Sequence, residues 1–189
     1  MMSWIVNIVL AFVLIKFIIY PGLGFLLGTG FPVVAVVSGS MEHDGSFNNW
    51  WESGAICSTN QCTQEKWYIE HGITKEKFRK FIFKNGFNTG DIMVLLGTKP
   101  KNIDVGDVIV FKSTKPYPII HRVIEVEDSK KAFIFETKGD HNPAQGNYDK
   151  NISEERLLGR AVFRIPYLGW IKILFFKLVY WIGGIIGIG

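Results

Sequence analysis

Ser38, Ser40 and His121 are residues whose types and settings could carry out nucleophilic chemistry. Ser38-Gly39-Ser40 ends the apolar run from Val33 to Val37. A serine hydroxyl is a weak nucleophile at neutral pH and needs a base within hydrogen-bond reach. At a junction between a strand and a turn, neighbouring backbone N–H groups are free to face a developing oxyanion. Ser-Gly-Ser is also a common turn, so a catalytic interpretation of Ser40 requires a base elsewhere in the chain.

His121 is the best candidate for that base among the four histidines. It lies inside Ile119 to Ile124, where an otherwise apolar strand would carry imidazole only for a reason. His43 lies in a polar turn, and His71 and His141 lie in loops. A histidine in a strand is often only a satisfied core or surface residue, so His121 as the base of Ser40 is a hypothesis.

A carboxylate is then expected to orient the imidazole and stabilise its charged form. The loop that starts at Lys138 offers two, Asp140 and Asp149. An aspartate in a Gly-Asp-x-Asn turn often only caps its own backbone. Both aspartates are therefore kept as candidates.

Short apolar segments joined by tight turns must position these side chains. They predict a mostly β fold, a compact all-β domain over residues 31–165 with an insertion at about 43–90. The run Val33 to Val37 is expected to be a strand buried on both faces. The other expected strands are Ile92 to Leu96, Val108 to Phe111, Ile119 to Glu127 and Ala132 to Thr137.

Both ends of the chain are apolar. The apolar run within residues 1–27 is as long as the roughly 20 residues that a helix needs to span a bilayer. No Lys or Arg precedes this run and no Ala-x-Ala site ends it, which favours an anchor over a cleavable signal peptide; a buried core helix is the alternative. From there to Ser40 the chain is short, so Ser40 is expected close to the membrane surface. Residues 166–189 predict a second transmembrane or interfacial helix, and we favour a span.

The insertion holds two cysteines and many aromatic residues. Cys57 and Cys62 suit a local disulfide outside the cytoplasm, with free thiols as the alternative. A zinc site of these cysteines with His43 and His71 is conceivable, although the spacing matches no standard pattern. A set of aromatic side chains could enter the lipid interface or, as we slightly prefer, form a satellite core: Trp50, Trp51, Phe78, Phe81, Phe83 and Phe87.

The formal charge of +4 is spread among acidic residues without a dense basic run. Nucleic acid is therefore not an expected partner. We expect at most a mild attraction to anionic membrane lipid.

Taken together, several motifs in this order resemble the type I signal peptidases, most closely the archaeal and endoplasmic-reticulum branch. The insertion lies outside the resemblance, which covers somewhat over half of the chain. The matching segments are Ser38-Gly39-Ser40-Met41-Glu42, Gly106 to Phe111, His121-Arg122-Val123, Lys138-Gly139-Asp140-x-Asn142, Gly159-Arg160 and Arg164 to Trp170.

The resemblance implies a serine endopeptidase that removes signal peptides from secreted preproteins near the secretion translocon. It implies a β catalytic domain in an integral membrane protein, on the extracytoplasmic side, with no metal or organic cofactor. Ser40 matches the nucleophile, His121 the base and Ser38 the hydroxyl that assists the oxyanion hole. In the family a second aspartate follows the Gly-Asp motif after a shorter gap. Here Gly146 occupies that place, so both Asp140 and Asp149 are carried and Asp149 is preferred.

Two other functions are compatible with the residues. One is a non-catalytic, membrane-anchored β module that binds a partner protein, with Ser40 as a turn residue. The other is a hydrolase of lipids or small esters, although the chain has no Gly-x-Ser-x-Gly elbow.

Overall fold

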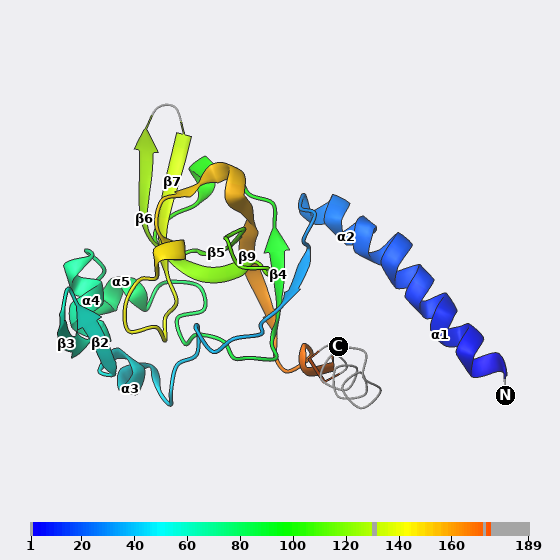
Figure 1. The fold of residues 1–189 in the computed structure, drawn as a ribbon, viewed down its shortest axis with the longest axis horizontal. Coiled ribbons are helices and arrows are strands. Elements are labelled where there is room, and N and C mark those ends of the chain that lie inside the picture. The colour runs from blue at the N-terminus through cyan, green and yellow to red at the C-terminus, as the bar shows by residue number, and fades with distance from the viewer. Residues whose placement is uncertain (1, 130–131, 172, 175–189) are drawn as a thin grey trace.

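The protein is mostly β, built around one curled, antiparallel sheet of seven strands with an apolar helix at the N-terminus (Figure 1). The computed structural model describes residues 2–129, 132–171 and 173–174. The strand order is β1-β4-β9-β5-β6-β7-β8. The strands are β1 (Val33–Ala35), β4 (Ile92–Leu96), β5 (Val108–Phe111), β6 (Ile119–Ser129), β7 (Ala132–Lys138), β8 (Ile152–Ser153) and β9 (Leu157–Ile165).

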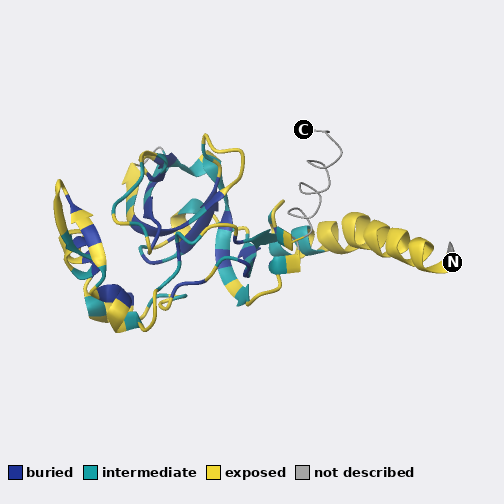
Figure 2. Ribbon diagram, turned by 60° about the horizontal axis from the view of Figure 1, so that its bottom comes forward, coloured by how far each residue is buried: buried dark blue, intermediate teal, exposed yellow. Residues whose placement is uncertain are grey.

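Strand β5 explains how the sheet forms its core. All four of its residues are buried, and they alternate between two apolar clusters. Val108 and Val110 pack with Met93 and Leu95 of β4, whereas the other two side chains of β5 pack with Phe135 of β7. A strand buried on both faces requires a continuous apolar run, as this one has. The buried residues line the curled sheet in Figure 2.

The expected strands over 92–96, 108–111, 119–127 and 132–137 are confirmed, with small differences at their ends. The run at Val33 to Val37 is an exception, because β1 covers only Val33–Ala35 and lies half-buried at the edge of the sheet. Val36 is buried, but Val37 is 55% exposed. The expectation of a strand buried on both faces is therefore wrong. Ala35 and Val37 line a pocket described below, and Val34 and Val36 pack in the core of the sheet. Short 3-10 turns complete this part of the chain at η2 (Pro100–Asn102), η3 (Asn147–Asp149) and η4 (Glu154–Arg156).

The insertion folds around its own aromatic core. Trp50, Trp51 and Phe78 are at most 1% exposed, Phe87 is buried in the core of the sheet, and Phe81 and Phe83 are partly buried. The satellite-core interpretation is confirmed for four of the six, because Phe83 and Phe87 pack in the core of the sheet; insertion of this aromatic set into lipid is wrong. The elements of the insertion are α3 (Phe47–Trp51), β2 (Gly54–Cys57), β3 (Asn60–Thr63), α4 (Gln64–Glu70) and α5 (Lys75–Phe78).

A disulfide closes the β2–β3 hairpin of the insertion by joining Cys57 to Cys62. The predicted local disulfide is thus present, and the free-thiol alternative is wrong. The zinc alternative is also wrong: the two sulfurs bind each other, His43 contacts Asp140, and His71 contacts a backbone carbonyl. Among the described residues, no group of three or more His, Cys, Asp or Glu side chains could hold a metal ion.

A continuous helix covers residues 2–27 as α1 (Met2–Leu14), the π-helical turn η1 (Ile15–Ile19) and α2 (Tyr20–Leu27). The wider turn lies just before Pro21, which has no N–H for the helical ladder. Gly28 ends the helix in a left-handed conformation. The segment Ser3–Leu27 is long and apolar enough to cross a membrane, and none of it is buried against the protein. The core-helix alternative is therefore wrong.

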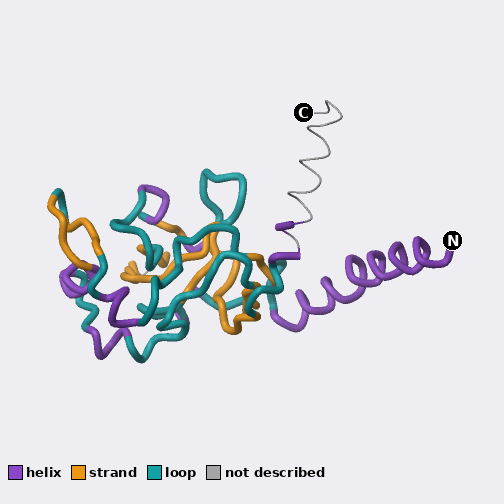
Figure 3. The backbone as a smooth tube through the Cα atoms, turned by 90° about the horizontal axis from the view of Figure 1, so that it is seen from below, coloured by secondary structure: helices purple, strands orange, loops and turns teal. Residues whose placement is uncertain are grey.

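The helix and the insertion lie at opposite ends of the molecule, with the sheet between them (Figure 3). The expected C-terminal membrane segment at 166–189 lies largely outside the described residues. The division into the ranges 1–27, 31–165 and 166–189 stays a prediction.

Candidate active site

Ser40 and His121 come together although they are far apart in the sequence. Ser40 lies in the turn after β1, and His121 projects from β6. The Oγ of Ser40 is 3.0 Å from Nε2 of His121. His121 is only 3% exposed, while Ser40 is partly exposed, so the hydroxyl can meet an external molecule and the imidazole is shielded from water.

Asp149 holds the other side of the imidazole. Its Oδ1 lies 2.5 Å from Nδ1 of His121. The same oxygen accepts a hydrogen bond of 2.7 Å from the hydroxyl of Thr137, and Oδ2 accepts one of 3.1 Å from the backbone N–H of Gly146. An ionised carboxylate can only accept, so it orients His121 with the proton on Nδ1 and leaves Nε2 to accept the proton of Ser40.

Asp140 does not contact His121. Its carboxylate accepts two hydrogen bonds from the guanidinium of Arg122, of 2.9 and 2.7 Å, and one of 3.1 Å from the hydroxyl of Tyr68. His43 Nε2 lies 3.0 Å from Oδ2. Burial alone would raise the pKa of Asp140, but the Arg122 charge and the hydrogen bonds hold it well below its usual range. Asp140 is thus part of a buried ionic network behind the site.

Ser38 lies next to the nucleophile candidate, with its Oγ 3.3 Å from Oγ of Ser40. Both hydroxyls border an apolar pocket of about 200 Å³. The pocket accounts for part of the apolar run before Ser38, because Ala35 and Val37 line it, whereas Val34 and Val36 pack in the core of the sheet. The rest of its lining comes from the start of β6, from the segment before β6 and from η3: Lys115, Tyr117, Pro118, Ile119, Ile120, His121 and Tyr148.

The turn at 139–142 closes the site on the side of the Ser40 backbone. The N–H of His141 donates a hydrogen bond of 2.9 Å to the carbonyl of Ser40. A Cβ atom on Gly139 would lie 2.7 Å from that carbonyl oxygen and 2.8 Å from Nε2 of His121. Only glycine allows the turn to approach both groups this closely.

Some residues around the site were not predicted from the sequence. Thr137 orients Asp149, and Arg122, Tyr68 and His43 surround Asp140. Arg122 could have been noticed, because a charged residue directly after His121 interrupts an apolar strand. His43 and Tyr68 belong to the insertion, and no sequence spacing connects them to a loop about 100 and 70 residues away.

The chain is similar over most of its length to two curated proteins. The signal peptidase complex catalytic subunit sec11 of Schizosaccharomyces pombe is 33% identical over 160 residues, which cover 82% of this chain and 72% of that protein. The chain belongs to the signal peptidases. The corresponding subunit SEC11 of Komagataella phaffii is 28% identical over 186 residues, covering 91% of this chain and 82% of that protein. No protein-family model matches the chain.

These relatives confirm the resemblance to type I signal peptidases of the endoplasmic-reticulum branch. The relationship and the apolar N-terminal helix together indicate a membrane protein. In this signal peptidase, the apolar pocket is lined in part by Ser40 and His121. His121 lies within hydrogen-bonding distance of both Ser40 and Asp149.

Proposed function

We propose that this chain is a membrane-bound serine endopeptidase that removes N-terminal signal peptides from secreted preproteins. The observation that carries the proposal is the chain of contacts from Ser40 through His121 to Asp149. Three side chains from separate elements meet in the order that activates a serine hydroxyl. The relatives are named as catalytic subunits of a signal peptidase complex, which supports the same activity and suggests that partner subunits take part.

The reaction would proceed by acyl-enzyme chemistry. His121 takes the proton of Ser40 as the hydroxyl oxygen attacks the scissile carbonyl, and Asp149 stabilises the imidazolium that forms. The backbone N–H of Ser40 and the hydroxyl of Ser38 hold the oxyanion. His121 then gives its proton to the leaving amine. Water, activated by the same imidazole, hydrolyses the ester on Ser40.

Asp149 is the proposed acid, and Asp140 supports the fold of the site. Asp149 contacts His121, whereas Asp140 contacts Arg122, His43 and Tyr68. The loop before Asp149 is longer than the family spacing, and it still brings the Asp149 carboxylate to His121.

The pocket beside Ser40 suits the small apolar residues that precede a signal-peptide cleavage site. It is lined by Ala35, Val37 and Ile119, and its volume of about 200 Å³ leaves room for short side chains. Signal peptides end in a small-residue, Ala-x-Ala-like site. The catalytic domain would lie on the extracytoplasmic side, where such substrates emerge, and the Cys57–Cys62 disulfide is consistent with that side.

The test is cleavage of a preprotein with an Ala-x-Ala site by membranes that contain this chain, compared with membranes that contain Ser40→Ala. We expect a mature product with the first and none with the second. Equal processing by both, or none by either, would contradict the proposal and favour the partner-binding β module. Covalent labelling of Ser40 by a fluorophosphonate without peptide cleavage would instead favour a hydrolase of lipids or small esters.

A further inference from the structure

The turn at residues 138–143 determines where Ser40 lies relative to its base. His141 donates its N–H to the carbonyl of Ser40 at 2.9 Å. Gly139 lies so close to Ser40 and His121 that it has no room for a side chain. A shift of this turn would therefore move the nucleophile, the base or both.

The insertion holds the same turn by contacts that are separate from the catalytic residues. The N–H of Ile56 donates to the carbonyl of Pro143 at 2.8 Å. The indole N–H of Trp50 donates to the carbonyl of Asp140 at 3.0 Å. The amide group of Gln64 donates to the carbonyl of Asn142 at 3.1 Å. The turn thus lies between the catalytic serine on one side and the insertion on the other.

Gln64 and Lys138 form a further connection between the insertion and the turn, and it is as buried as that of Trp50 with Asp140. Nζ of Lys138 donates to Oε1 of Gln64 at 2.8 Å, and the two residues are 0% and 1% exposed. The ammonium group also donates to the carbonyl of Gly139 at 3.1 Å and lies 4.9 Å from the ring of Trp67. A buried charge is tolerated only when its hydrogen bonds are satisfied, so the loss of Gln64 would leave Lys138 in an unfavourable site.

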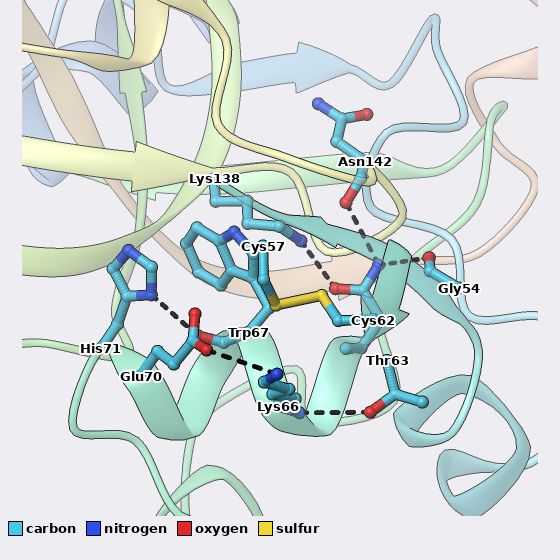
Figure 4. Close-up of a disulfide and its surroundings, with 11 residues drawn as sticks. Gly54, Cys57, Cys62, Thr63, Lys66, Trp67, Glu70, His71, Lys138 and Asn142 are labelled. Carbon is cyan, nitrogen blue, oxygen red and sulfur yellow. Dashed lines mark hydrogen bonds and ion pairs between the residues drawn. A yellow bond between two sulfur atoms is a disulfide. The ribbon is translucent and has the colours of Figure 1, made fainter. Parts of the chain in front are cut away.

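Gln64 follows directly from the disulfide-closed hairpin. It is the first residue of α4, two positions after Cys62, and its amide group also contacts the carbonyl of Gly54 at the start of β2. In Figure 4 the side chain of Lys138 and the backbone carbonyl of Asn142 point toward this hairpin, beside the disulfide. The hairpin therefore positions the side chain of Gln64, which in turn contacts the 138–143 turn.

We propose that Gln64 and Lys138 are positioning residues for the Ser40 nucleophile, through which the disulfide-closed insertion contributes to the active site. The inference rests on the proposed peptidase function. It gives a structural role to the insertion, which has no counterpart among the family motifs. The insertion holds the 138–143 turn, and the turn holds Ser40 in line with His121.

The first experiment compares Gln64→Leu with the matched control Gln61→Leu in the full chain in detergent. Gln61 is exposed on β3 of the same hairpin, three residues earlier. For Gln64→Leu we expect backbone hydrogen exchange at residues 140–142 to become about 10-fold faster, because buried hydrogen bonds are lost. We expect about a 10-fold slower labelling of Ser40 by a fluorophosphonate, and a similar fall in kcat with KM nearly unchanged. Gln61→Leu should match the wild-type chain in all of these.

A second variant removes the other partner of the contact. Lys138→Met should produce the same changes, and the double variant should be no worse than either single one, because both residues act through one contact. Exchange and labelling rates in Gln64→Leu and Lys138→Met equal to those of Gln61→Leu would overturn the inference. A retained disulfide, measured as the mass after thiol blocking, separates loss of the contact from loss of the fold. The exchange rates still decide the inference if the cleavage test with Ser40→Ala fails, so the two proposals can fail separately.

Discussion

At the scale of single residues, the surroundings of the two aspartates assign them different tasks. Asp149 contacts His121, and Asp140 is enclosed by Arg122, Tyr68 and His43. Asp149→Asn should lower kcat by about 10,000-fold, because an amide cannot stabilise the imidazolium or keep the correct tautomer. The unfolding midpoint should change little. The measurement is single-turnover cleavage of a preprotein together with thermal unfolding.

Asp140→Asn should instead lower the free energy of unfolding. Removing one partner of a buried ion pair leaves Arg122 uncompensated, which costs about 3–5 kcal/mol. Residual activity per folded molecule should exceed that of Asp149→Asn by at least about 100-fold, because His121 keeps its partner. If Asp140→Asn is as stable as the wild-type chain but equally inactive as Asp149→Asn, the assignment of the acid must be reversed.

The lowered pKa of Lys138 predicts how the stability of the fold depends on pH. Burial lowers this pKa from 10.5 to about 7. The charges of Asp140 and Asp149 raise the pKa, and the charge of Arg122 lowers it further. Between about pH 7 and 10.5 the unfolded chain therefore binds more protons than the folded chain. The free energy of unfolding should rise with pH in this window, by at most about 1.4 kcal/mol per pH unit. Lys138→Met should reduce that rise, measured as unfolding midpoints at pH 7, 8 and 9; equal pH dependence in both chains would contradict it.

The sequence pointed to part of the site for identifiable reasons. Ser40 and His121 each stand out locally, one in a turn after an apolar run and the other inside an apolar strand. The choice between Asp140 and Asp149 depended on family spacing, because both lie in one loop. Gln64 had no signal at all, since a polar residue at the start of a short helix is ordinary until tertiary structure places it beside Lys138.

At the scale of elements, strands with apolar patterns were predictable and others were not. β5 is a continuous apolar run with turn residues on both sides, and it formed as expected. β9 was missed because two arginines and a glycine interrupt its apolar pattern. The β2–β3 hairpin was missed because four-residue strands of mixed polarity carry little periodicity.

The disulfide is expected to stabilise the hairpin from which Gln64 projects. Cys57 and Cys62 are five residues apart, a short loop for which chain entropy predicts about 2 kcal/mol of stabilisation. Replacing both cysteines by serine should lower the unfolding free energy by about that amount and speed hydrogen exchange first in β2 and β3. The comparison is exchange of the hairpin against exchange of β5 in the same protein. Equal acceleration in both would show that the hairpin does not open separately.

At the scale of the whole molecule, the helix, the sheet and the insertion follow one another along its length (Figure 1). The turn that carries Ser40 follows β1, which begins only a few residues after the helix ends at Leu27. Ser40, the proposed nucleophile, is thus joined to the end of the helix by a short stretch of chain, and the insertion lies at the other end of the molecule. In a membrane-inserted protein, this arrangement would present the pocket near the surface where a signal peptide leaves the bilayer.

The arrangement makes a definite prediction about the N-terminal helix. Its 25 residues from Ser3 to Leu27 extend about 38 Å at 1.5 Å per residue, more than the roughly 30 Å of bilayer hydrocarbon. Single cysteines at Ser3 and at Glu127, an exposed residue of β6, should therefore lie on opposite faces of a membrane. In sealed vesicles, a maleimide that does not cross the bilayer should label only one of the two variants, and both after detergent is added. The native cysteines, Cys57 and Cys62, are joined in a disulfide, so the parent chain without an added cysteine should not be labelled. Labelling of both variants before detergent would mean that the helix lies along the membrane surface instead of crossing it.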